Sequence, residues 1–215
     1  MSMGPSRHLP LRIAAICAAL CLLSSCRTDT APQTGDLIFF TGGTSSMDDA
    51  ISSSTGDGFV HVAIVEVDSE GTAWLIDATP QKGVSREKLE TKLLEEKGKA
   101  VLMRLKDSTG VAASVQRAKG LIGSPYDFAF LPDNDAYYCS ELVYECFLRP
   151  DGSHIFSCQP MNFLNSEGNL PEYWKDLFEK LQMDVPQGLP GTNPEDLSRS
   201  TTLRGIHSSD TRTTL

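Results

Sequence analysis

Basic residues are scarce in this 215-residue chain, which has 19 lysines and arginines against 28 aspartates and glutamates. The formal net charge is −9. Nucleic-acid binding needs a basic surface, because much of the affinity comes from counterions released when phosphates are neutralised. We therefore expect no nucleic-acid partner. The length and the 40% hydrophobic content suit one domain of ordinary size with a sizeable core.

The sequence also lacks closely spaced metal ligands and internal repeats. No C-x-x-C or H-x-x-x-H pair occurs, and such pairs fix the geometry of many zinc sites. The sequence contains no internal repeat and no low-complexity tract, so an array of modules is not expected. We therefore expect neither a metal nor a cofactor.

The apolar run from Ile13 to Leu23 is too short to span a bilayer comfortably, but it follows Arg7 and Arg12, as in an export signal. It ends in "LSSC", which resembles the lipobox of bacterial lipoproteins, whose cysteine is diacylated after cleavage. We predict a signal peptide over residues 1–25, lipidation of Cys26 and attachment to a membrane of the bacterial cell envelope. The alternative is an ordinary cleaved signal with a free Cys26.

The rest of the chain indicates one mixed domain. Residues 26–34 are polar and typical of a tether, the domain is expected over 35–200, and 201–215 is expected to be a disordered tail. Alternating or aliphatic patterns predict strands, of which the first three should pair antiparallel, over residues 35–43, 59–68, 72–80 and 101–106.

Helical spacing and capping residues predict the helical segments. A short helix should follow a cap at Ser46 or Asp48. Further helices are expected over residues 85–97 and 109–123, and one that begins at Cys139.

Beyond the N-terminal segment the cysteines are Cys139, Cys146 and Cys158, so at least one has no partner within the chain. An unpaired thiol outside the cytosol is a liability unless it has a function. Cys146 and Cys158 are close enough in sequence to form a disulfide, although a buried reduced Cys146 is the preferred interpretation. Either arrangement leaves Cys139 free.

Cys139 begins the helix in "AYYCSELVYECF", where unsatisfied amide groups and the helix dipole favour a thiolate. The alternative is a neutral core cysteine, because cysteine is among the most buried residue types.

His61 interrupts the apolar strand "VHVAIV", and Asp77 lies near the end of the next strand. A buried carboxylate needs a hydrogen-bond donor, and an imidazole one strand away would supply it. Cysteine, histidine and aspartate together form the set that activates a sulfur nucleophile. His61 would move the proton and Asp77 would orient the ring; Asp57 and Glu66 are the next candidates for the third role.

Several segments in order resemble the YiiX-like branch of the NlpC-type cysteine peptidases, also described as permuted papain-like amidases. The segments are "GDLIFF", "HVAIV", "LIDATPQKGV", "GSPYDFAF", "YYCSELVYECF" and "NPEDLSRS". The resemblance implies an α+β, circularly permuted papain-like fold in which an antiparallel sheet packs against helices. It places the nucleophile at Cys139, the base at His61 and the third polar residue at Asp77, where relatives often have glutamate.

The resemblance implies a hydrolase that cleaves amide bonds through a thioacyl-enzyme, with cell-wall peptides as candidate substrates. The Cys139 backbone amide would bind the oxyanion, and Tyr138 and Ser140 are further oxyanion or substrate-binding candidates. The alternatives are an acyltransferase or lipid-amide hydrolase, a non-catalytic binding protein of the envelope, and a zinc site formed by the same three residues. The oligomeric state stays open.

Overall fold

The computed structural model describes residues 30–206, except residues 44, 57 and 96–99. The predicted signal peptide, Cys26, Asp57 and most of the predicted tail lie outside the described residues. The described residues from Pro32 onward form one compact unit. No helix in the described part is both long enough and apolar enough to cross a membrane.

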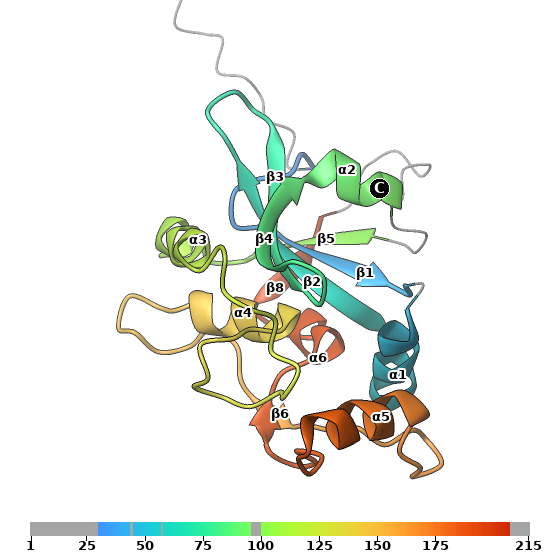
Figure 1. Cartoon of the computed structure of the whole chain (residues 1–215). Coiled ribbons are helices and arrows are strands. Elements are labelled where there is room, and N and C mark those ends of the chain that lie inside the picture. The colour runs from blue at the N-terminus through green and yellow to red at the C-terminus, as the bar shows by residue number, and fades with distance from the viewer. Residues whose placement is uncertain (1–29, 44, 57, 96–99, 207–215) are drawn as a thin grey trace, which may run out of the picture. The chain divides into compact units, whose positions relative to one another are not determined.

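A six-stranded antiparallel sheet is the framework of this unit, in the order β4-β3-β2-β1-β5-β8 (Figure 1). Its strands are β1 (Leu37–Thr41), β2 (Phe59–Val67), β3 (Ala73–Thr79), β4 (Gly83–Lys88), β5 (Ala100–Leu105) and β8 (Leu203–Gly205). A second, two-stranded sheet pairs β6 (Gln159–Pro160) with β7 (Pro190–Gly191). The predicted antiparallel pairing of the first three strands is confirmed.

Helices cover both faces of the large sheet. They are α1 (Ser46–Thr55), α2 (Leu89–Glu95), α3 (Val111–Gly120), α4 (Cys139–Cys146), α5 (Glu172–Leu181) and α6 (Pro194–Ser198). In Figure 1, α4 and α6 lie against β2 on one side of the sheet, and α2 lies on the other.

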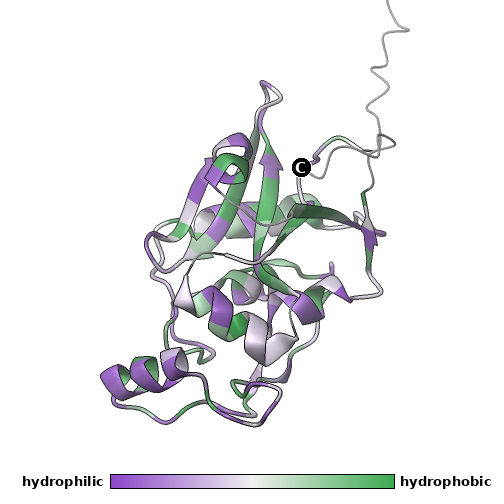
Figure 2. Cartoon of the chain, turned by 90° about the vertical axis from the view of Figure 1, so that its right-hand side faces the viewer, coloured by the Kyte–Doolittle hydropathy of each residue, from purple (hydrophilic) through white to green (hydrophobic). Residues whose placement is uncertain are grey.

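Alternate residues of β2 serve two separate cores, because successive side chains of a strand point to opposite faces. Val62 and Ile64 belong to the larger core, with α4, whereas Ala63 and Val65 belong to a smaller core that includes Leu89 of α2. Figure 2 shows hydrophobic residues concentrated in the strands of the sheet. The sheet is therefore buried on both faces at β2, the strand that carries His61.

The helix predicted over residues 85–97 is wrong in its first part. Residues Gly83–Lys88 form β4, which pairs with β3 so that Ser85 lies opposite Asp77, and α2 begins only at Leu89. The charged composition of this segment suits a solvated helix, but pairing with a neighbouring strand overrides such a local preference.

Two predicted boundaries also differ from those in the structure. The cap of α1 is Ser45, whose hydroxyl accepts from the Asp48 N–H while the Asp48 carboxylate accepts from the Ser45 N–H. The domain does not end at residue 200, because Leu203–Gly205 form β8 and pair with β5. The predicted tail over 201–215 therefore begins too early.

Candidate active site

Helix α4 presents Cys139 as its first residue, next to the central strand β2. The Glu141 carboxylate accepts from the Tyr138 N–H at 3.3 Å, and this contact closes the start of the helix. Leu142 and Val143 are fully buried in the larger core and fix the orientation of α4. A fully buried aliphatic side chain contributes roughly 1.5–3 kcal/mol, so the position of Cys139 is held by the core.

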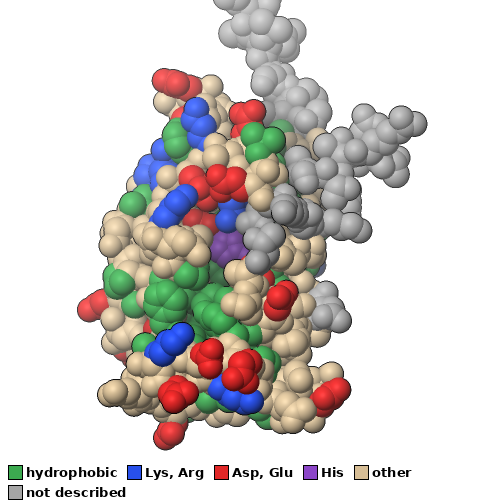
Figure 3. Space-filling view, turned by 45° about the vertical axis from the view of Figure 1, so that its right-hand side comes forward, with side chains coloured by type: hydrophobic (Ala, Val, Ile, Leu, Met, Phe, Trp, Pro, Cys, Tyr) green, Lys and Arg blue, Asp and Glu red, His purple; other side chains and the backbone are tan. Residues whose placement is uncertain are grey.

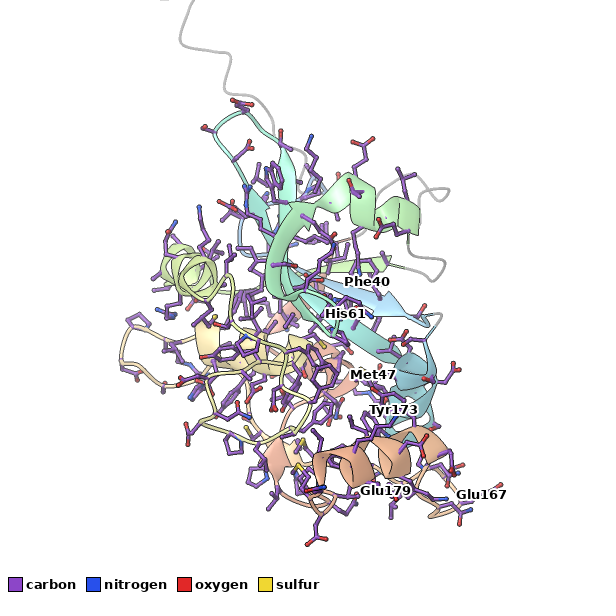
Figure 4. All side chains as sticks on the ribbon, viewed as in Figure 1. Phe40, Met47, His61, Glu167, Tyr173 and Glu179 are labelled. Atoms are coloured by element: carbon purple, nitrogen blue, oxygen red, sulfur yellow. The ribbon has the colours of Figure 1, made fainter. Side chains whose placement is uncertain are left out.

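His61 lies on β2 where the strand departs from regular pairing with β1. The register shifts between Phe40 and Thr41, directly opposite His61. The imidazole lies beside the Phe40 ring, with a centroid separation of 5.9 Å. Figure 4 shows His61 at this end of the strand with Phe40 beside it and Met47 below. The extra residue at this irregularity is Val60, directly before His61.

Asp77 on β3 contacts the imidazole. Its Oδ2 atom lies 2.9 Å from His61 Nε2, and the aspartate is fully buried. Because Nε2 is occupied, Nδ1 is the ring nitrogen that remains for Cys139. The structure thus brings the three predicted residues, His61, Asp77 and Cys139, into one chain of contacts.

The surroundings of His61 favour the charged imidazolium. Burial alone would lower the pKa of His61, but the negative charge of a Cys139 thiolate and hydrogen bonds with Asp77 and Cys139 raise it to about 10. The two negative groups thus outweigh the loss of solvent. At neutral pH the ring holds a proton between a sulfur and a carboxylate.

The other candidates for the third role do not join this arrangement. Glu66 pairs with Arg86 and Lys119, each at 2.6 Å, and Asp57 lies outside the described residues. Another histidine, His154, stacks on Tyr144 with a ring separation of 3.9 Å. The acid that contacts His61 is therefore Asp77.

Tyr138 and Ser140 flank Cys139 in the sequence, and the structure places both in the protein interior. The Tyr138 hydroxyl accepts from the Thr192 N–H at 3.1 Å, and its ring packs against Phe130. Ser140 is fully buried. Tyr138 thus joins α4 to the segment before α6 through its hydroxyl.

Tyr126 is a site residue that the sequence did not single out. It is buried in the core, its hydroxyl lies 3.6 Å from the Met47 sulfur, and it lines the same cavities as Cys139. Burial, and next the charge of a Cys139 thiolate, raise the pKa of Tyr126 well above its usual range. The phenol therefore stays protonated, and in this structure its hydroxyl donates to the Met47 sulfur beside the cavities that Cys139 lines. Its segment, "GSPYDFAF", carries no spacing signal that links it to Cys139.

Two cavities of different chemistry meet at Cys139. One, of about 60 Å³, is mainly apolar and is called the aromatic cavity here because its lining includes Tyr126, Phe130, Phe163 and Trp174. The other, of about 190 Å³, is more polar and includes His61, Asp48, Thr79, Gln81 and Lys92. Figure 3 shows the same contrast on the surface, where hydrophobic side chains gather beside a histidine and charged side chains lie on its other side.

The cysteines of the described residues are reduced in the structure. Cys139, Cys146 and Cys158 are all free thiols. Burial raises the pKa of Cys146 to about 12. Among the described residues, no group of three or more His, Cys, Asp or Glu side chains is arranged to hold a metal ion.

The sequence model of the family described as "Permuted papain-like amidase enzyme, YaeF/YiiX, C92 family" matches residues 31–207. The chain is 27% identical over 158 residues to the uncharacterized protein YiiX of Escherichia coli K12, covering 72% of this chain and 76% of YiiX. A crystal structure titled as the metalloprotein YiiX from Escherichia coli O157:H7 superimposes with a TM-score of 0.69 at 24% identity. That superposition covers 82% of this chain and 97% of the other, and supports the fold.

Proposed function

The chain belongs to the permuted papain-like amidase family, and from that premise we propose that it is a cysteine hydrolase that cleaves amide bonds through a thioacyl-enzyme. The observation that carries the proposal is the order of contacts in the site. Cys139 lies at a helix start, and the His61 ring lies between it and the buried Asp77, which is 2.9 Å from the imidazole. This is the arrangement in which a base activates a nucleophile and a third group orients the base.

In the proposed acylation step, the Cys139 sulfur attacks the carbonyl carbon of the substrate and a C–S bond forms. The carbonyl oxygen becomes an oxyanion, which the Cys139 backbone N–H and the Tyr126 hydroxyl stabilise. The protonated His61 ring then gives its Nδ1 proton to the amide nitrogen. The C–N bond breaks and the amine leaves.

In the deacylation step, neutral His61 takes a proton from water as the water oxygen attacks the thioester carbon. The C–S bond breaks, and the acid product leaves with the second oxygen from water. Cys139 returns to a thiolate beside a protonated His61. Asp77 keeps its contact with Nε2 throughout, so that Nδ1 continues to face the sulfur.

The position of His61 assigns the two cavities to the two halves of the substrate. The leaving amine must be close to the group that protonates it, so it occupies the polar cavity that His61 lines. The acyl half then occupies the aromatic cavity on the other side of Cys139. The proposed substrate therefore has a polar amine and a less polar acyl half.

We place the enzyme at the bacterial cell envelope, held by lipidated Cys26, with cell-wall peptides as the substrate class. The support is the basic start, the apolar run and the "LSSC" sequence. The YiiX crystal structure is titled a metalloprotein. Among the described residues of this chain no group of three or more His, Cys, Asp or Glu side chains could hold a metal ion, and no step of the proposed reaction passes through a metal.

The test is incubation with fragmented peptidoglycan and, separately, with lipid amides, followed by mass spectrometry of the products. We expect new amine and carboxyl ends in the peptidoglycan sample, and none with the Cys139→Ala variant. Cleavage only of lipid amides would contradict the cell-wall assignment. Equal products with wild type and Cys139→Ala would contradict the enzymatic proposal.

A further inference from the structure

Residues 192–199 take no part in the proposed reaction, although they include helix α6 and most of the motif "NPEDLSRS". In Figure 1, α6 lies next to α4, which carries Cys139, and next to β2, which carries His61. A segment in this place is able to control how far apart the two reacting side chains lie.

The first contact of this segment is with the start of α4. The Thr192 N–H donates to the Tyr138 hydroxyl at 3.1 Å, and Tyr138 is the residue directly before Cys139. The tyrosine is only 5% exposed, and its ring packs against Phe130. Because the ring is held in the core, this hydrogen bond ties the backbone of Thr192 to the end of α4 that presents Cys139.

The second contact is with the start of β2. Glu195 Oε2 accepts from the Phe59 N–H at 2.9 Å. Phe59 is the first residue of β2 and lies two residues before His61. Glu195 is buried, and its Oε1 atom pairs with Arg199 at 2.8 Å. Both oxygens of the carboxylate therefore have a partner, and the carboxylate holds the strand from a fixed direction.

This end of β2 is less fixed by the sheet than the rest of the strand. The ladder between β1 and β2 is irregular here, and Val60, between Phe59 and His61, is the extra residue. The pairing that joins β2 to β3 runs from Ile64 to Val67, beyond His61. A hydrogen bond from outside the ladder thus adds to the position of the strand just before His61.

The backbone leaves room for this carboxylate at Gly58. A Cβ atom at that position would lie 1.9 Å from Glu195 Oε2 and 2.3 Å from its Cδ atom, well inside van der Waals contact. Any side chain at residue 58 would therefore displace the carboxylate from Phe59. Glycine is the residue that permits the contact.

We infer that Glu195 is a positioning residue, and that residues 192–195 form a brace that holds the starts of α4 and β2 at a fixed separation. The inference rests on the proposed function, because it takes Cys139 and His61 as the reacting pair. Without the hydrogen bond to Phe59, the irregular end of β2 shifts and the imidazole moves away from the sulfur. A misplacement of about 1 Å can reduce a rate by about 10²-fold.

The test compares Glu195→Ala with two variants that keep the hydrogen bond. Glu195→Gln retains an oxygen that accepts from the Phe59 N–H, and Arg199→Ala removes only the partner of the other oxygen. Glu195 is outside the linings of both cavities, so substrate binding does not depend on it directly. We expect Glu195→Ala to lower kcat by about 10- to 100-fold with KM little changed. The other two variants should stay close to wild type.

The pH at which iodoacetamide alkylates Cys139 at half its maximal rate gives a readout that needs no substrate. His61 and Tyr126, the ionisable side chains beside the sulfur, are present in every variant. An imidazolium that lies farther from the sulfur stabilises the thiolate less, so the midpoint should rise in Glu195→Ala and not in Arg199→Ala. Denaturant unfolding gives the folded fraction of each variant, and a purely structural role of Glu195 would lower stability without moving the midpoint.

Gly58→Ala tests the same contact from the strand side. Its Cβ atom should displace the Glu195 carboxylate and raise the midpoint as Glu195→Ala does. In the double variant the second substitution should add little, because the atoms that it would meet are already gone. If Glu195→Ala does not fold, the comparison of Gly58→Ala with Arg199→Ala replaces it.

The outcomes separate the brace from the proposed function. An unchanged kcat and midpoint in Glu195→Ala, or strictly additive effects in the double variant, overturn the brace while a reactive wild-type Cys139 still supports the nucleophile. A wild-type Cys139 that reacts no more readily than Cys146 contradicts the proposed function instead. If the wild type cleaves no amide that is offered, the midpoints alone decide whether Glu195 positions His61.

Discussion

At the scale of single residues, proton transfer at the site depends on how His61 is held. Its pKa is raised to about 10 because the favourable effects of Cys139 and Asp77 exceed the unfavourable effect of burial. The ordinary value for histidine is about 6.5. The stabilisation from this raised pKa is fully present below the ordinary value and is lost as the pH rises through about 10.

The raised pKa of His61 predicts an alkaline limit of activity. His61 must be protonated to release the amine, so kcat/KM should fall only as the pH approaches about 10. The measurement is kcat/KM against pH for any amide that the enzyme cleaves. A fall already complete by about pH 8 would show that the imidazolium is not stabilised as the site geometry implies.

Substitutions at Asp77 should separate its orienting role from that of His61. His61→Ala should reduce turnover by about 10²–10⁴-fold, because general acid–base catalysis is lost. Asp77→Asn should keep part of the activity, since the amide oxygen can still accept from the ring, and Asp77→Glu should keep more. Steady-state rates check the order, and full activity in Asp77→Ala would remove Asp77 from the mechanism.

At the scale of elements, the start of α4 contains a second buried ionisable group, Glu141, which is 8% exposed. Burial, and next repulsion by Asp127, raise the pKa of Glu141 to about 8, against the opposing effect of the hydrogen bond from the Tyr138 N–H. The native state therefore binds a proton at Glu141 that the unfolded chain releases near pH 4.5.

The proton held by Glu141 should make the stability of the wild type depend on pH in a way that a neutral replacement at this position does not. Relative to Glu141→Gln, the wild type should lose unfolding free energy as the pH rises from about 4.5 through about 8, on the order of 5 kcal/mol in total. Denaturant unfolding of both proteins across this range measures the difference. A constant difference, or a wild type that gains stability with rising pH, would contradict the buried neutral carboxyl.

The elements also show what local sequence does and does not determine. The strands β1, β2, β3 and β5 follow from their aliphatic patterns, and α4 from the spacing after Cys139. Strand β4 does not, because its charged residues resemble a solvated helix and only pairing with β3 makes it a strand. Proximity across the fold, such as that of Tyr126 and Cys139 in the linings of the same cavities, leaves no trace in local spacing.

At the scale of the whole molecule, the types of the site residues and their order along the chain predict much of the candidate site. Histidine, acid and cysteine were predicted together because each residue type is unusual in its local setting, and the fold brings these three into contact. The two cavities, and the fact that Cys146 and Cys158 are free thiols, depend on packing between distant segments of the chain.

The predicted lipid anchor is a property of the full chain. Each buried methylene of an acyl chain contributes about 0.8 kcal/mol, so two or more chains should give attachment that high salt does not reverse. The acidic domain itself would be repelled by anionic lipid. Cells labelled with a palmitate analogue should incorporate it into the wild type but not into Cys26→Ser, and no incorporation into the wild type would contradict the anchor.

The most direct test of the central claim is the alkylation of the cysteines by iodoacetamide at neutral pH, followed by peptide mass spectrometry. Thiolates react and buried thiols do not. Cys139 is only 5% exposed but lines both cavities, whereas Cys146 is 1% exposed and has a pKa raised to about 12. Cys139 should therefore be modified well before Cys146 and Cys158, and more slowly in His61→Ala. Equal labelling of all three cysteines in the folded protein, unaffected by His61→Ala, would contradict the activation of Cys139.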